Sequence, residues 1–170
     1  MSPRRGLGDE IWRLAGAGDT AGLERVSELL ADDGEFDYES RRALAFRHAL
    51  DGRTDQALAE LNDGWAEDWP PPSAYALDVA RIHLLVGDCE RALSALQLEL
   101  RGLSQWSGAN EIVAACVRRN PRMWRRGLRL ALAAEAGVLG KLRAAAVVGR
   151  ARFGGGELPT KALPDPSPGS

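Results

Sequence analysis

Apolar residues recur along this chain every three or four positions, which is the spacing of helices that bury one face. The first such stripe runs through Leu7, Ile11 and Leu14, and comparable stripes continue through most of the chain. Alanine and leucine are abundant and only 6 % of the residues are aromatic, a composition that favours helix over strand. The pattern therefore predicts an all-α fold.

Glycine-containing breaks divide the predicted helices into antiparallel pairs. Gly18, Gly52 and Gly87 are spaced 34 and 35 residues apart, and each stands between two apolar stripes. A small residue, Ala57 or Ala92, opens the second helix after the second and third breaks, where it lets the two helices approach closely. A period near 34 residues with one helical hairpin in each unit is typical of solenoid proteins.

These units resemble the tetratricopeptide repeat (TPR). The resemblance covers about residues 8–103 and is strongest at 40–103, where Leu44-Ala45 and Val79-Ala80 match the family's hydrophobic-then-small pair. It implies a right-handed stack of antiparallel helical hairpins, a TPR-like α-solenoid. The helices from residue 109 onward are expected to form a divergent fourth pair and a C-terminal capping helix, which covers the exposed end of a solenoid.

The chain also departs from the tetratricopeptide pattern. Arg41 and Ala76 stand where the family has a tryptophan in the first helix, and His48 and His83 replace its usual aromatic residue. In the first unit, Leu23 stands where an alanine is expected. These departures leave open whether the first hairpin and the C-terminal helices are true repeat units.

The domain organisation follows from the same pattern. Residues 1–6 are expected to be a flexible N-terminus, residues 7–153 a TPR-like helical repeat domain, and residues 154–170 a disordered tail rich in Gly, Pro and Ser. The last predicted helix runs from Val138 to about Arg152. Its expected buried line consists of Leu139, Leu142 and Ala146.

Two further features favour a soluble cytoplasmic protein. No run of about 18 apolar residues is present to span a membrane, and no apolar segment follows the N-terminus as it does in a signal peptide. The two cysteines, Cys89 and Cys116, each have apolar neighbours in a helical pattern. Buried free thiols in a reducing compartment are therefore expected.

The tetratricopeptide resemblance also implies a function. Domains of that family bind peptides or helices of other proteins along a concave surface lined by the first helix of each pair. The chain is therefore expected to be a protein–protein interaction scaffold or adaptor, and its partner is expected to be another protein. The groove residues expected to contact that partner are Arg41, His48, Tyr75, Ala76 and His83.

An arginine-rich helix, predicted for residues 121–136 from its Asn120-Pro121 start, supports an alternative function. Arginines spaced i, i+3, i+4 and i+7 share one of its faces. They are Arg122, Arg125, Arg126 and Arg129. Like charges this close repel one another, so the face is expected either to bind an acidic peptide, a phosphate or nucleic acid, or to be a solvated face. In the second case Glu111 and Glu135, or the acidic half of a second copy, would partly neutralise it.

The charge distribution is uneven although the formal net charge is only -2. Residues 1–100 hold 10 Lys+Arg and 20 Asp+Glu, whereas residues 101–170 hold 12 and 4. Such an imbalance is a hint about partners and would also allow head-to-tail self-association. The oligomeric state stays open at this point.

Other candidate sites have a simpler interpretation as structure. His48 and His83 occupy equivalent repeat positions and are expected to lie near each other, but no third ligand is in register for a metal. The acidic stretch from Asp32 to Glu39 lacks the order of an EF-hand loop and is expected to be a solvated linker. The last helix carries Lys141 and other cations and could lie on an anionic membrane surface, although a capping role is favoured.

Catalytic motifs do not occur in the sequence. There is no G-x-S-x-G nucleophile elbow, no P-loop and no G-x-G-x-x-G fingerprint, and the cysteines do not form a C-x-x-C pair. We therefore expect the chain not to be an enzyme and to require no cofactor.

Overall fold

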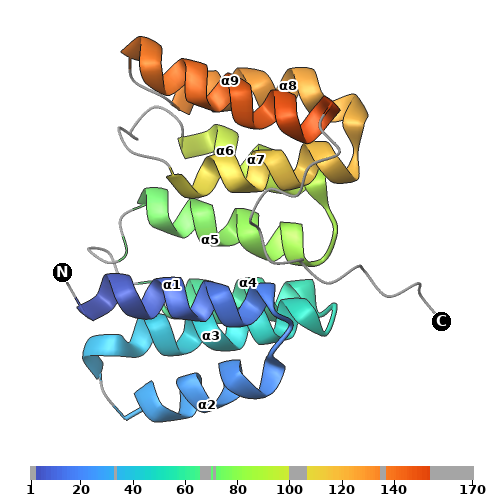
Figure 1. The fold of residues 1–170 in the computed structure, drawn as a ribbon. Coiled ribbons are helices and arrows are strands. Elements are labelled where there is room, and N and C mark those ends of the chain that lie inside the picture. The colour runs from blue at the N-terminus through green and yellow to red at the C-terminus, as the bar shows by residue number, and fades with distance from the viewer. Residues whose placement is uncertain are drawn as a thin grey trace. The chain divides into compact units, whose positions relative to one another are not determined.

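Helices alone form the regular structure of the residues that the computed structural model describes, which are 3–32, 34–65, 70, 72–99, 107–134 and 137–153 (Figure 1). The α-helices are, in chain order, α1 (Pro3–Gly16), α2 (Thr20–Leu30), α3 (Asp37–Leu50), α4 (Thr54–Asp63), α5 (Pro72–Leu85), α6 (Cys89–Glu99), α7 (Ser107–Arg119), α8 (Trp124–Ala134) and α9 (Gly137–Phe153). Short 3-10 turns at Gly34–Phe36 and Pro121–Met123 precede α3 and α8. The predicted all-α class is confirmed.

The described helices include none that is both long enough and apolar enough to cross a membrane. At the N-terminus, α1 already begins at Pro3, four residues before the first expected apolar position at Leu7. The predicted tail, residues 154–170, lies outside the described residues.

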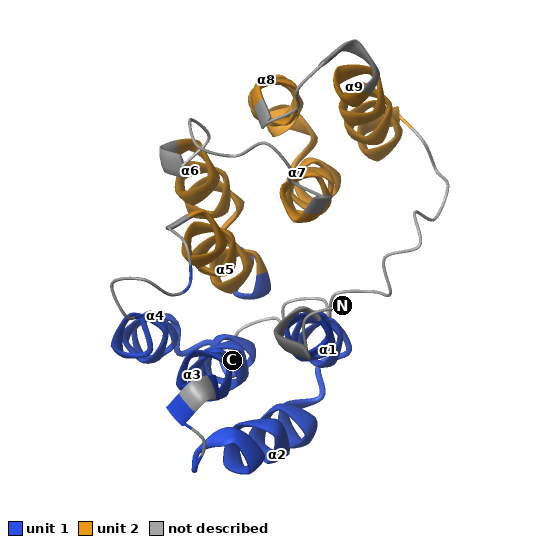
Figure 2. Ribbon diagram, turned by 90° about the vertical axis from the view of Figure 1, so that its left-hand side faces the viewer, with its two compact units in different colours: residues 1–70, 85–87, 159–170 blue, residues 71–84, 88–158 orange. Residues whose placement is uncertain are grey.

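The chain divides into two compact units (Figure 2). The described part of unit 1 contains α1 to α4 and the short segment Leu85–Gly87. Unit 2 contains α5 as far as Leu84 and then α6 to α9. In unit 1, α3 packs against α1, α2 and α4, and in unit 2, α7 packs against α6, α8 and α9.

The three predicted glycine breaks are helix C-caps of the same kind. Gly18, Gly52 and Gly87 have φ angles of 67°, 75° and 85°, in the left-handed region that side chains disfavour. In each case the amide after the glycine donates to a carbonyl five residues back, the hydrogen bond of a Schellman motif. These bonds join Asp19 N to Leu14 O (3.0 Å), Arg53 N to His48 O (2.9 Å) and Asp88 N to His83 O (2.8 Å).

The helices that follow these glycines begin in a related way. Asp19 and Asp88 are side-chain N-caps, because Asp19 Oδ1 accepts from Gly22 N at 2.8 Å and Asp88 Oδ1 accepts from Arg91 N at 2.9 Å. Arg53 takes this place before α4 and makes no side-chain cap. The middle hairpin therefore keeps the glycine turn but lacks the capping carboxylate.

Equivalent positions of the three hairpins are buried to the same degree. Ile11, Ala45 and Ala80 in the first helices have no exposed surface. The same holds for Leu23, Ala57 and Ala92 in the second helices, including the leucine that departs from the tetratricopeptide pattern. The period read from the glycines thus also describes the core.

Unit 1 is organised around α3. Phe46 has no exposed surface, and its ring meets that of Trp12 edge to face with centroids 5.6 Å apart. Ser40 lies inside the first turn of α3, which begins at Asp37. Its buried hydroxyl donates to the carbonyl oxygen of Ser27 at 3.0 Å and so joins α3 to α2.

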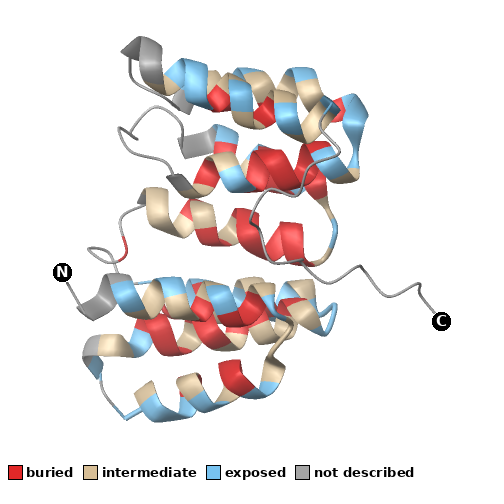
Figure 3. Ribbon diagram, viewed as in Figure 1, coloured by how far each residue is buried: buried red, intermediate tan, exposed pale blue. Residues whose placement is uncertain are grey.

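Unit 2 is organised around α7, where every residue from Ile112 to Val117 is buried (Figure 3). Glycines allow neighbouring helices to approach it closely. A Cβ on Gly127 of α8 would lie 2.9 Å from side-chain carbons of both Val113 and Val117. A Cβ on Gly108 would lie 3.0 Å from Leu77 of α5.

The glycines of α8 and α9 allow a matched test of this packing. Gly127→Ala is expected to destabilise the protein by roughly 1–3 kcal/mol, because the new methyl group meets two stiff β-branched side chains. Gly149→Ala, inside α9, is expected to be neutral or stabilising by up to about 1 kcal/mol, because nothing lies within 4 Å of its Cβ position. Urea unfolding of both variants measures the two signs. A stabilising Gly127→Ala would contradict the close contact between α7 and α8.

The buried line of α9 differs from the prediction. Among the described side chains of α9, Ala144 and Val148 are buried, whereas Leu142 is 61 % exposed and Ala146 is also exposed. The side chain of Leu139 lies outside the described part of the chain. The error arises because the apolar residues of α9 are spread over several of its faces, so periodicity alone does not identify the buried face.

Candidate functional site

The five predicted groove residues fall in both units and differ in exposure. Arg41 and His48 lie on α3 in unit 1, and both are partly exposed. Tyr75, Ala76 and His83 lie on α5 in unit 2. Tyr75 is partly exposed and burial raises the pKa of its hydroxyl, whereas Ala76 and His83 are each only 7 % exposed. The side chains with surface to offer a partner are therefore Arg41, His48 and Tyr75.

Arg41 has a structural role within its own hairpin. Its guanidinium lies 3.4 Å from an oxygen of Asp37 on α3 and 3.3 Å from an oxygen of Glu60 on α4. Its stem crosses Gly64, where a Cβ would lie 2.8 Å from Arg41 Cδ. Arg41 thus joins the two helices of the hairpin, so its loss would affect packing as well as any partner contact.

His48 and His83 have similar surroundings, each within its own unit. Each supplies the carbonyl that accepts the Schellman hydrogen bond of its hairpin. The Nδ1 atom of each is buried and has no hydrogen-bond partner among the described residues. Burial is the main cause that lowers the pKa of both imidazoles. These observations describe neutral packing histidines, and their expected proximity stays a prediction.

The described residues contain no group of three His, Cys, Asp or Glu side chains that could hold a metal ion. The acidic stretch departs from the expected solvated linker at one end. Glu39 lies inside α3 and is only 3 % exposed, because α3 begins at Asp37. Glu39 is therefore part of the helix packing of unit 1.

The histidines predict a specific pH dependence of stability. Their pKa values are lowered on folding, so below about pH 6.5 the unfolded chain takes up protons that the folded chain does not. The free energy of unfolding is therefore expected to decrease as the pH is lowered below this value. The decrease is at most about 1.4 kcal/mol per pH unit for each histidine. Urea unfolding between about pH 5.5 and 7.5 measures the slope. The His48→Gln/His83→Gln double variant should flatten it, and an unchanged slope would refute this origin.

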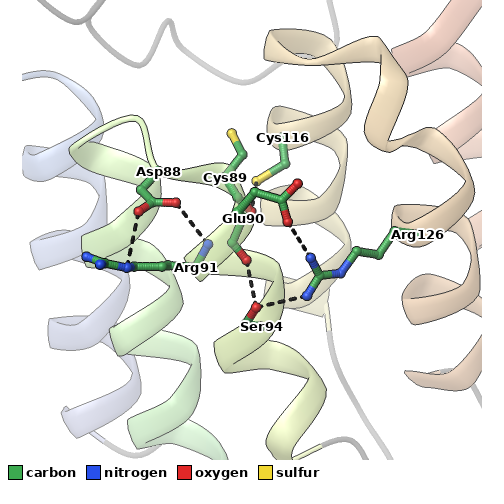
Figure 4. Close-up of polar contacts among 7 residues, drawn as sticks. All are labelled: Asp88, Cys89, Glu90, Arg91, Ser94, Cys116 and Arg126. Atoms are coloured by element: carbon green, nitrogen blue, oxygen red, sulfur yellow. Dashed lines mark hydrogen bonds and ion pairs between the residues drawn. The ribbon is translucent and has the colours of Figure 1, made fainter.

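The arginine face is divided between structural and exposed side chains. Arg126 donates to a carboxylate oxygen of Glu90 and, at 2.8 Å, to the hydroxyl of Ser94 (Figure 4). Both partners belong to α6, so Arg126 joins α8 to α6. Of the four arginines of the predicted face, Arg126 is therefore already paired within unit 2.

The remaining three arginines, Arg122, Arg125 and Arg129, are exposed, and none forms an ion pair with a described residue. Arg122 lies in the 3-10 turn that precedes α8. Asn120 caps the start of this turn, because its side-chain oxygen accepts a hydrogen bond from Arg122 N at 3.2 Å. Arg125 lies over the ring of Trp124, 5.7 Å from its centroid. These three side chains are available to an anionic ligand.

Carboxylates are lacking throughout α8 and α9, which pack against each other. The exposed cations of the two helices are Arg125, Arg129, Lys141, Arg143 and Arg150. The glutamate that pairs with this surface is Glu90 of α6, which lies 36 residues before Arg126 in the chain. The sequence predicted Glu111 and Glu135 as the residues that neutralise the arginine face. Glu111 forms no ion pair among the described residues, and Glu135 lies outside them. Sequence proximity could not identify Glu90.

No protein-family model, curated protein or solved structure matches the chain significantly. The tetratricopeptide resemblance therefore rests on the residues of the three hairpins.

Proposed function

We propose that the chain is a TPR-like helical-repeat module that binds a peptide or helix of another protein and acts as a scaffold or adaptor. The observation that carries the proposal is the repetition of one hairpin three times, with the same glycine cap and the same buried positions. Repeats of this kind stack into right-handed solenoids and are typical of extended protein-binding surfaces. The proposal includes α7 to α9 as the divergent end of such a stack.

The partner would contact the first helices of the hairpins, as it does in tetratricopeptide repeats. Within each unit, the proposal assigns this role to partly exposed side chains, which are His48 of unit 1 and Tyr75 of unit 2. Ala76 and His83 would shape the packing beneath, because they are buried. Arg41 would combine a partner contact with its bridge to Glu60.

Affinity capture from a source lysate after nuclease treatment tests this proposal. The His48→Ala/Tyr75→Ala variant should lose the captured protein, with an affinity at least about tenfold weaker, since partly buried aromatic groups contribute strongly to interfaces. The matched control is Gln56→Ala/Gln97→Ala, which changes exposed residues on the second helices α4 and α6. Equal loss from both variants, or retention by both, would contradict binding through the first helices.

A second candidate function rests on three exposed arginines of unit 2 that form no ion pair with a described residue. We propose that α8 and α9 bind a polyanion, either an acidic protein segment or nucleic acid, through Arg122, Arg125 and Arg129. The supporting observation is that these exposed arginines have no carboxylate partner on either helix. Self-repulsion of such a surface decreases when an anionic ligand covers it.

Fluorescence anisotropy with labelled poly-glutamate and with a labelled oligonucleotide tests the second candidate. Replacing the three arginines with glutamine should abolish binding and remove a salt slope of about -2 to -3 in log K against log [salt]. The control, Arg13→Gln/Arg25→Gln/Arg53→Gln, makes the same charge change at exposed arginines of unit 1. Equal weakening by the control would indicate an effect of net charge, and the stronger of the two probes identifies the class of partner.

A further inference from the structure

The two cysteines of the chain lie against each other inside unit 2. Cys89 is the first residue of α6, and Cys116 lies in the buried middle of α7. The sulfur of Cys116 is 3.9 Å from the carbonyl oxygen of Cys89 and hydrogen-bonds to it. Figure 4 shows the side chain of Cys116 directed from α7 toward the start of α6. Both are free thiols, 27 residues apart in the chain.

The surroundings make the two thiols chemically different. The hydrogen bond from Cys116 lowers the pKa of Cys89, and the same bond, together with burial, raises the pKa of Cys116. The positive charge of Arg119 favours a thiolate at both positions, and Asp88 opposes it at both. Glu90 opposes the thiolate of Cys89. Cys89 also lies at a helix N-terminus, where the backbone amides favour a negative charge. Cys89 is thus suited to act as the nucleophile that reacts with an oxidant, and Cys116 as the resolving cysteine that reacts with oxidised Cys89.

Access agrees with this division of roles. Cys89 is 7 % exposed, whereas Cys116 has no exposed surface. A small oxidant therefore reaches Cys89 before Cys116. An isolated buried cysteine would be inert, but here the sulfur of Cys116 lies against the backbone of Cys89.

We propose that Cys89 and Cys116 form an oxidisable site that hydrogen peroxide converts into a disulfide joining α6 to α7. In the first step Cys89 loses its proton, and its thiolate attacks one oxygen of hydrogen peroxide. The O–O bond breaks, Cys89 becomes a sulfenic acid, and the departing hydroxide takes up the proton that Cys89 released to form water. In the second step the Cys116 sulfur attacks the Cys89 sulfur and the S–O bond breaks. The departing hydroxide takes the Cys116 proton, so two thiols are oxidised as one peroxide is reduced to two waters.

The disulfide would connect the third hairpin to the C-terminal helices within unit 2. A crosslink over 27 residues restricts the unfolded chain and is expected to raise the melting temperature of the full-length protein by roughly 5–15 °C. A thiol such as dithiothreitol should reverse the change, because the product is a disulfide. The site would thereby make the stability of unit 2 depend on the oxidant level, independently of which partner the protein binds.

Titration of the reduced full-length chain with hydrogen peroxide, followed by alkylation and peptide mass spectrometry, tests the proposal. The expected product is a monomer lighter by two hydrogens, with Cys89 and Cys116 in one crosslinked peptide and an increased melting temperature. The outcome that would overturn it is loss of both thiols without an intramolecular crosslink, either as sulfinic acids or as disulfide-linked dimers.

Two serine variants test the order of events. In Cys116→Ser the reaction should stop at a sulfenic acid on Cys89 that dimedone traps, whereas in Cys89→Ser the remaining thiol should resist peroxide by at least about tenfold in rate. Equal reactivity of the two variants would refute the assigned roles. If a variant does not fold, the rate at which each wild-type cysteine is alkylated by iodoacetamide decides between the same outcomes, because Cys89 should react first.

Discussion

Replacing Asp78 with alanine is expected to lower the free energy of unfolding by about 3–5 kcal/mol. Asp78 Oδ1 accepts a hydrogen bond from Arg81 Nη1 at 2.9 Å, and the two side chains are only 3 % and 11 % exposed. The start of α7 lies beside the arginine, since a Cβ on Gly108 would be 3.5 Å from Arg81 Nη2. Removing the carboxylate leaves a buried guanidinium charge without this counter-charge, which is the situation that buried ion pairs tolerate least.

Urea unfolding of Asp78→Ala measures the loss, and two companion variants interpret it. Glu111→Ala removes an exposed carboxylate of α7 and is expected to change stability by no more than about 0.5 kcal/mol. Asp78→Ala/Arg81→Met removes both charges and should recover most of the loss, because neither charge of the pair is then buried without the other. If Asp78→Ala behaves like Glu111→Ala, the pair is not buried in solution. If the double variant recovers nothing, the loss comes from packing rather than from charge.

The sequence predicted the parts of the fold that local physics decides. Glycine at positions 18, 52 and 87 predicts a left-handed backbone conformation, because residues with a side chain disfavour that conformation. All three glycines have positive φ angles. Asn120 followed by Pro121 likewise predicts a helix start from local hydrogen bonding, and the cap is present. The period of the glycines then located buried positions such as Ala57 and Ala92.

The sequence could not predict contacts that depend on which helices meet. Asp78 and Arg81 stand at i, i+3 spacing, which is common on solvated helix surfaces, and α5 gives no sign that the pair is buried. Glu90 pairs with Arg126 because α6 packs beside α8, a relation that spacing along the chain does not contain. The buried face of α9 was missed for the opposite reason, because several of its faces are equally apolar.

The same distinction applies to the candidate sites. The arginine face was found because charges on one helix can be read from its period, but the division between Arg126 and its exposed neighbours required the position of α6. The cysteines were predicted as buried thiols, which they are, yet their mutual contact joins two separate helices. Local pattern identified the residue types, and tertiary packing decided what each of them can do.

Replacing Ala45 and Ala80 together with leucine is expected to lower the free energy of unfolding by about 2–6 kcal/mol, which is a large part of the stability of an ordinary domain. The two alanines are equivalent positions of the second and third hairpins, and neither has any exposed surface. A leucine adds three carbon atoms at a fully buried position, at a cost of roughly 1–3 kcal/mol for each site. The sites lie in different units, so the two losses should add.

Thermal melting followed by circular dichroism measures the single and double variants. The control is Ala59→Leu/Ala146→Leu, which makes the same chemical change at exposed positions of α4 and α9 and should alter stability by no more than about 0.5 kcal/mol. Because the control adds the same apolar surface, it separates overpacking from a general effect of added leucine. Equal losses at Ala45 and Ala80 would mean that the two hairpins use one packing rule, as a repeat requires. A loss at only one of them would limit the repeat to that hairpin, and the proposed binding surface along the first helices would lose its structural basis.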